Sequence, residues 1–149
     1  MTGSEIDYAD YAAVFRDFPG PVALLTPDFA FADANLMYLE VAGRDREDLL
    51  GSNVFAVFPD NPADPDAAGS SNVRASLERV LATGERDSMP LQRYDVEVPG
   101  SPGVFEERYW STINTPIFGP DGHVKLIAHR VEEVTLIARQ LLELQVSSA

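Results

Sequence analysis

The sequence predicts an α+β domain in which helices cover one face of a five-stranded antiparallel sheet. Apolar residues recur at helical spacing near the start and in the middle of the chain, whereas much of the last third alternates with a period of about two. Turns rich in proline and glycine separate these segments. The resulting order is a helix, two strands, short helices, one longer helix, three strands and a final helix. Strands and helices segregated in this way favour an antiparallel sheet.

The bulk composition is that of one globular domain. With 149 residues, of which 45% are hydrophobic and 23% charged, the chain is long enough to bury a single core. The 24 acidic residues outnumber the 11 basic ones and give a net charge of -13, which repels phosphate backbones and anionic lipids. We therefore expect neither nucleic acid nor a membrane surface as a partner.

Cysteine is absent from the sequence, which excludes disulfides, thiolate metal sites and any cysteine-linked chromophore. The first residues carry acidic charge and no apolar run, so they are not a signal peptide. No stretch approaches the roughly 18 consecutive apolar residues that a membrane span needs. These features predict a soluble, cytoplasmic protein.

Residues 1–18 are predicted to form an N-terminal flanking helix. Apolar side chains recur there at helical spacing, and the Pro-Gly-Pro break at 19–21 ends the pattern. The short apolar runs 22–25 and 29–32 lie on either side of a Pro-Asp turn. They predict a first hairpin.

Two short helices are predicted over 35–41 and 46–50, because Gly43 and Gly51 are well placed to end them. The stretch 59–72 is rich in proline and aspartate and predicts an irregular loop. A longer helix then ends near Gly84. Its N-cap is expected at Ser70, Ser71 or Asn72, and its apolar stripe comprises Val73, Leu77, Val80 and Leu81.

Residues 89–98, 104–118 and 123–134 predict three consecutive antiparallel strands. Thr135 is a good N-cap for a final helix with a narrow apolar stripe. So short an isolated helix is marginal in water, so we expect it to continue in a longer protein or to pair with a copy of itself in a homodimer. We assign 19–134 to the core domain and 135–149 to the start of a C-terminal signalling helix. The stripe comprises Ile137, Leu141 and Leu144.

Several local motifs point to a known family of domains. They are Val22–Asn35, Arg46–Gly51, Val57–Pro62, Arg74–Val80, Met89–Asp95, Phe105–Ser111 with Asn114 and Pro116, and His129–Thr135. Together with the element order, these motifs resemble the PAS fold over roughly residues 18 to 140. The resemblance implies a non-catalytic sensory domain of a bacterial signal-transduction protein, which passes a conformational signal through its C-terminal helix to an output domain such as a histidine kinase. It also implies dimers formed through the flanking helices.

Glu133 and Thr135 form the expected signal junction. The segment His129–Thr135 is similar to the acidic-hydrophobic-threonine motif through which PAS domains connect to their effectors, with Glu133 where aspartate is usual. A carboxylate and a hydroxyl that hold the first turn of a helix tie the direction of that helix to the sheet.

Polar and aromatic side chains on the predicted strands form a candidate pocket for a small-molecule ligand. The alternative is an ion-pair network on the outer face of the sheet. His129 should share a face with Ile127 and Val131, where it is either a haem ligand or a structural histidine bonded to a neighbouring strand. Flavin bound without a covalent bond also stays open, so the cofactor is unknown. The candidate residues are His129, Trp110, Asn114, Arg108 and Tyr94.

Motifs for catalysis or metal binding are missing from the sequence. There is no nucleophile with an evident base, and Asp60, Asp64 and Asp66 lack the glycine and distal glutamate of a calcium loop. We therefore predict no catalytic residue and no metal site. Two alternatives to a ligand sensor are a ligand-free dimerisation scaffold and a cone-shaped isomerase-like enzyme that uses a buried aspartate and tyrosine.

Overall fold

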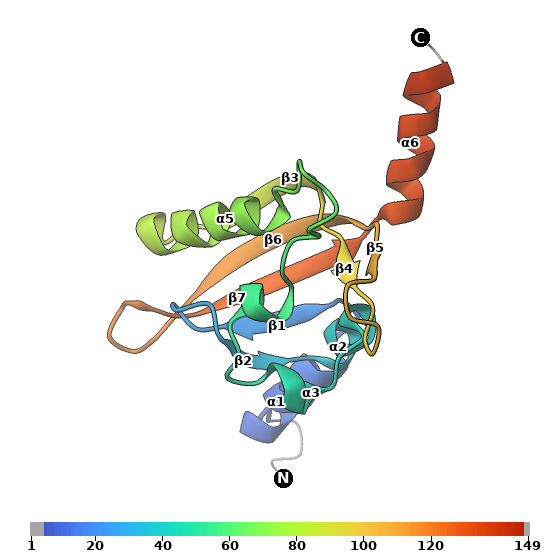
Figure 1. Ribbon diagram of the computed structural model, residues 1–149. Helices are drawn as coiled ribbons and strands as arrows, with labels where there is room; N and C mark the ends of the chain where they lie inside the picture. The colour runs from blue at the N-terminus through green and yellow to red at the C-terminus, as the bar shows by residue number, and fades with distance from the viewer. Residues whose placement is uncertain (1–4, 148–149) are drawn as a thin grey trace.

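The computed structural model describes residues 5–147 and confirms the predicted α+β architecture (Figure 1). Its centre is a five-stranded antiparallel sheet in the order β2-β1-β7-β6-β3. Residues 1–4 and 148–149, the outer ends of the two predicted flanking helices, lie outside the described residues. The strands of this sheet are β1 (Val22–Leu25), β2 (Phe31–Ala34), β3 (Asp87–Arg93), β6 (Tyr109–Phe118) and β7 (Val124–Glu133).

The N-terminal helix α1 (Tyr8–Asp17) lies outside the core, since none of its side chains is buried. Asp7 and Asp10 form a reciprocal capping box at its start. The chain then enters the β1-β2 hairpin, which the Asn35 side chain stabilises through two hydrogen bonds to the backbone. The Asn35 amide donates to the Gly20 carbonyl at 2.8 Å, and its Oδ1 accepts from the Val22 N–H at 3.0 Å.

Four helices follow the hairpin: α2 (Leu36–Ala42), α3 (Arg46–Leu49), α4 (Val54–Val57) and α5 (Gly69–Thr83). Gly43 ends α2 with a φ of 66°, in the left-handed region that favours glycine. The expected N-cap of α5 at Ser70, Ser71 or Asn72 is wrong, because the helix already begins at Gly69. Asp60, ten residues upstream, instead accepts hydrogen bonds from the backbone N–H and the hydroxyl of Ser70.

The strands predicted over 89–98 and 104–118 are each split in two. The end of the first predicted strand and the start of the second form a separate small hairpin of β4 (Val96–Glu97) and β5 (Phe105–Glu106). The break falls at Tyr94 and Asp95, where the guanidinium of Arg93 holds the buried Asp95 carboxylate through two hydrogen bonds of 3.0 Å. This local ion pair interrupts the alternation on which the strand prediction depended.

The core lies on one face of the sheet, under α2, α4 and α5. Alternate residues of β6 and β7 point into it, so Trp110, Thr112 and Asn114 face the same interior as Ile127 and His129. The fully buried side chains include Phe31, Leu25, Leu49, Leu77 and Val80. The predicted placement of His129 beside Ile127 and Val131 is confirmed.

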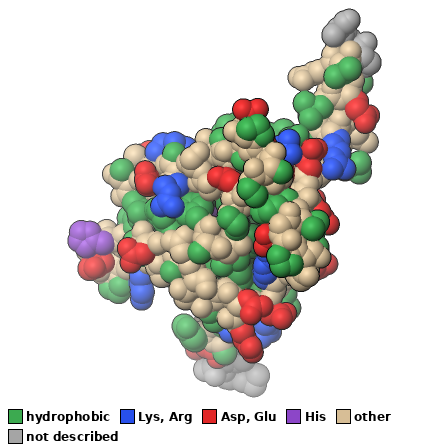
Figure 2. Space-filling view, viewed as in Figure 1, with side chains coloured by type: hydrophobic (Ala, Val, Ile, Leu, Met, Phe, Trp, Pro, Cys, Tyr) green, Lys and Arg blue, Asp and Glu red, His purple; other side chains and the backbone are tan. Residues whose placement is uncertain are grey.

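The last helix, α6 (Thr135–Ser147), stands away from the body of the domain (Figures 1 and 2). Only its first turn is anchored by burial, through Ala138. Within the described residues, no helix is both long and apolar enough to cross a membrane.

Candidate functional site

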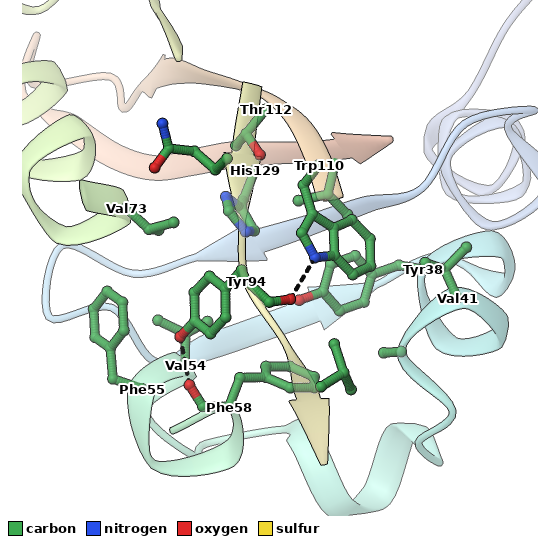
Figure 3. A pocket seen from close by; sticks show the side chains of 14 residues that line it. Tyr38, Val41, Val54, Phe55, Phe58, Val73, Tyr94, Trp110, Thr112 and His129 are labelled. Carbon is green, nitrogen blue, oxygen red and sulfur yellow. Dashed lines mark hydrogen bonds between the residues drawn. The ribbon is translucent and has the colours of Figure 1, made fainter. Parts of the chain in front are cut away.

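A cavity of about 60 Å³ lies between the sheet and the helices α2, α4 and α5 (Figure 3). The volume corresponds to roughly two water molecules. None of the side chains around the cavity is charged at neutral pH. They are Tyr38, Val41, Ala42, Val54, Phe55, Phe58, Val73, Gln92, Tyr94, Val96, Trp110, Thr112, His129 and Val131.

His129 is a buried polar residue on this wall, with only 4% of its surface exposed. It lies on β7 directly opposite Asn114 of β6, and its Nδ1 is 2.6 Å from the Asn114 Oδ1. Burial lowers the pKa of His129 to about 4, so the imidazole is neutral at physiological pH. This bond to the neighbouring strand agrees with the interpretation of His129 as a structural histidine.

Asn114 connects His129 to the surface through a buried series of hydrogen bonds. Its Nδ2 donates to the Ser76 hydroxyl on α5 at 2.9 Å, and Ser76 donates to the Asp87 carboxylate at 2.5 Å. The Arg79 guanidinium holds Asp87 with bonds of 3.0 and 2.9 Å and keeps the pKa of that carboxyl below its usual range. We call these five residues the polar network.

Tyr94 and Trp110 form adjoining parts of the cavity wall, and the polar atoms of both are already bonded. The Trp110 indole N–H donates to the Tyr94 carbonyl at 2.8 Å, and the Tyr94 hydroxyl donates to the Phe58 carbonyl (Figure 3). Burial raises the pKa of Tyr94, which keeps the phenol protonated. Gly69 fits against this ring, because a Cβ there would lie 2.6 Å from the Tyr94 Cγ.

The candidate residues do not all meet in the cavity. His129, Trp110 and Tyr94 line it, whereas Asn114 is not among the lining residues and is fully buried beside His129. The placement of Arg108 in this pocket needs correction. Arg108 precedes β6 and so does not share its alternation, and its guanidinium is held outside by the Val41 carbonyl at 2.9 Å.

Arg108 lies instead beside Glu133 and Thr135, the predicted signal junction. Its guanidinium lies 3.4 Å from one oxygen of Glu133 and 2.7 Å from Glu106. The other Glu133 oxygen accepts from the Thr135 hydroxyl at 2.9 Å, and that hydroxyl accepts from the Tyr109 N–H at 3.1 Å. The prediction of Thr135 as a helix N-cap is therefore wrong. Thr135 is the first residue of α6 and bonds the sheet rather than the helix, while the Val134 carbonyl accepts from Ala138.

Neither haem nor flavin fits the cavity. Pockets for drug-sized ligands begin at roughly 300 Å³, several times the 60 Å³ found here. The residues present match a much smaller occupant.

Sequence reasoning missed much of the helical wall of the cavity. Tyr38, Phe55 and Phe58 are three of the five phenylalanine, tyrosine and tryptophan residues that line it, and they lie on or beside α2 and α4. The pair Phe55 and Phe58, at helical spacing, was an available signal. No sequence signal pointed to the hydrogen bond between Ser76 and Asp87, because the spacing of these two residues follows no motif.

Comparison with known proteins identifies the fold family. A family model described as PAS fold matches residues 15–139. The PAS domain of a Colwellia psychrerythraea protein superimposes with a TM-score of 0.65 at 12% identity, over 85% of this chain and 96% of that one. A Vibrio cholerae sensory box sensor histidine kinase superimposes with a TM-score of 0.56 at 16% identity, over 84% of this chain and 89% of that one. VqmA bound to DPO superimposes with a TM-score of 0.58 at 20% identity, over 85% of this chain and 57% of that one. No curated protein matches the sequence. The chain thus belongs to the PAS fold family, as its sequence motifs and sheet order indicate.

Proposed function

We propose that this chain is a non-catalytic sensory domain that reports the occupancy of its cavity through α6. The observation that carries the proposal is the position of Arg108 between cavity and helix. The Val41 side chain lines the cavity and its carbonyl accepts from Arg108, which also contacts Glu133. Glu133 holds Thr135, where α6 begins.

A ligand that displaces the α2 wall changes the position of the Val41 carbonyl. Arg108 then has to follow that carbonyl or give up its contact with Glu133, and either response alters how the Thr135 hydroxyl is held. A shift of this kind biases the direction of α6, because buried and hydrogen-bonded elements move between discrete arrangements. An output domain such as a histidine kinase would receive the signal.

The comparisons support a sensory role for the domain. One neighbour is a sensor histidine kinase and another, VqmA, was solved bound to DPO. Both are less than 25% identical to this chain, so they support the fold and the general role.

Native mass spectrometry of protein purified from cells, combined with an absorption spectrum, tests whether a small molecule is bound. Hydrogen exchange of the α6 amides is then compared between bound and stripped protein. We expect a bound mass and a change in exchange that Arg108→Ala abolishes. Equal α6 exchange in both states would refute signalling through this junction.

The second candidate is a ligand-free dimerisation scaffold. The observation in its favour is the exposed apolar stripe on α6, where Ile137, Leu141 and Leu144 are all more than half exposed. Protein that is colourless and free of any bound mass, but dimeric, favours this candidate over the sensor.

An isomerase-like reaction is not favoured by the geometry. The buried aspartate that such an enzyme needs would be Asp95, which does not line the cavity. Although burial raises the pKa of Asp95, hydrogen bonds from Arg93 and Asn61 outweigh that effect and the pKa is lowered. A carboxylate stabilised in this way is a poor general base.

A further inference from the structure

Each hydrogen bond of the polar network has a defined donor and acceptor, and the charge of Asp87 at the surface end of the network determines which is which. Asp87 is paired with Arg79 through two hydrogen bonds, so it is ionised and can only accept. The Ser76 hydroxyl, 2.5 Å from Asp87, must therefore donate its single proton outward. From this point inward, each group is left with one role.

Ser76 can then only accept from Asn114, so the amide nitrogen of Asn114 faces Ser76 at 2.9 Å. The amide oxygen consequently faces His129, and the proton between them belongs to His129 Nδ1. Because burial keeps the imidazole neutral, its other nitrogen, Nε2, carries a lone pair and no proton.

His129 Nε2 is a hydrogen-bond acceptor in a side chain that lines the cavity. In the part of the chain that the structure describes, the ring's hydrogen bond is the one made by Nδ1 to Asn114. No fully enclosed side-chain nitrogen or oxygen there lacks a partner, so Nε2 retains surface that another molecule can reach. The ring lies near Thr112, Trp110 and Tyr94 in Figure 3.

The rest of the wall restricts the charge of an occupant. The Trp110 N–H and the Tyr94 O–H already donate hydrogen bonds to backbone carbonyls. Burial raises the pKa of Tyr38, so that side chain stays uncharged as well. An ionised ligand would find no opposite charge among the lining side chains, which makes its burial costly.

We infer that the cavity binds a small, neutral, mainly apolar molecule that donates an N–H or O–H to His129 Nε2. This inference rests on the proposed sensory function and names its ligand class. The occupant must be small, or must move the α2 wall outward, because a cavity of roughly 150 Å³ is needed for benzene.

The tautomer can be measured without any ligand, by long-range ¹H–¹⁵N correlation of the His129 ring. We expect a protonated Nδ1 and a bare Nε2 in the unmodified protein. Ser76→Ala frees the Asn114 amide to turn over, so the Nε2–H tautomer should become populated. Asp87→Asn, at a less buried position than Ser76, should also populate the Nε2–H tautomer. Ser71→Ala, on the exposed side of the same helix, should leave the ring unchanged. A predominantly Nε2-protonated ring in the unmodified protein overturns the inference.

The ligand class is tested with two isomeric probes of equal size, 4-methylpyrazole and 1-methylpyrazole, of which only the first has an N–H. Each has six heavy atoms, as benzene has, so binding of either requires the wall to move outward. Trp110 is the single tryptophan of the chain and lines the cavity, so its fluorescence reports binding at this site. One neutral hydrogen bond predicts affinity about fivefold to tenfold higher for 4-methylpyrazole. Equal affinities, or binding of neither isomer, overturn the inference.

These outcomes are separable from failure of the sensor. A copurified ligand without a donor group, together with a response of α6, overturns the ligand class and leaves the sensory function standing. Tight binding of 4-methylpyrazole with no change in α6 exchange supports the ligand class and refutes the signalling route.

Discussion

His129 Nδ1 lies 2.6 Å from Asn114 Oδ1, across directly paired positions of β7 and β6. This contact joins the only buried imidazole among the described residues to a network that ends at an exposed arginine. It therefore influences both the stability of the domain and the chemistry of its cavity.

The first prediction concerns pH. Burial lowers the pKa of His129 to about 4, whereas an unfolded chain has a histidine pKa of about 6.5. Between these values the unfolded state binds a proton that the folded state does not, so acidification favours unfolding. We expect the free energy of unfolding to fall by up to about 3 kcal/mol as the pH drops from about 6.5 to about 4. Urea titrations at several pH values measure it.

His129→Gln should remove most of this slope, while His123→Gln, at an exposed turn position, should keep it. Carboxylates titrate in all three proteins, so the difference between the curves isolates His129. Parallel curves for the unmodified protein and His129→Gln would contradict the prediction.

The second prediction concerns the close approach of α5 to Tyr94. In an open helix position, Gly→Ala stabilises by roughly 0.5–1 kcal/mol. At Gly69 the new methyl group would meet the Tyr94 ring at 2.6 Å, so we expect Gly69→Ala to destabilise by about 1–3 kcal/mol. Thermal unfolding checks the sign. Combining it with Tyr94→Ala should cost less than the sum of the two changes, and strict additivity would argue against the clash.

The third prediction concerns the Arg108–Glu133 contact. The two charges are 3.4 Å apart and partly exposed, so a double-mutant cycle with Arg108→Gln and Glu133→Gln should give a coupling of only about 0.5–1 kcal/mol. Each single change should nevertheless increase hydrogen exchange in the first turn of α6. Arg16→Gln, whose ion pair with Asp17 lies on α1, is the control and should leave α6 exchange unaltered.

The fourth prediction concerns self-association through α6. Leu141 is 53% exposed within the apolar stripe, so Leu141→Glu should lower the dimer fraction measured by sedimentation velocity. Gln140→Glu adds the same charge at the neighbouring exposed position and should have a smaller effect. A monomer mass that does not depend on concentration, for the unmodified chain, would dismiss the dimer.

Periodicity predicted the fold well where a strand has one buried face. The alternation in β6 and β7 correctly put Trp110 and Asn114 on one face and His129 beside Ile127, but it did not decide between the inner and the outer side of the sheet. It failed at Arg108, because the residues just before β6 leave the ladder and follow local charges instead.

Contacts between distant segments were beyond sequence reasoning. Asp60 takes over the role expected of a local cap at the start of α5, and Ser76 meets Asp87 only because α5 packs beside β3. Thr135 was recognised as a junction residue, yet its hydroxyl bonds β6. In each case the partner depends on tertiary packing, which a sequence pattern does not encode.

A single residue, Val134, separates the last residue of β7 from the first of α6. A helix of 13 residues is roughly 20 Å long at 1.5 Å per residue. With its base clamped to the sheet and its far end pointing away from the body of the domain (Figure 1), it has the geometry of a lever arm. A rotation of about 10° at Thr135 would carry the far end through roughly 3 Å over that length, more than half the pitch of an α-helix and enough to change which side chains meet across a helix pair.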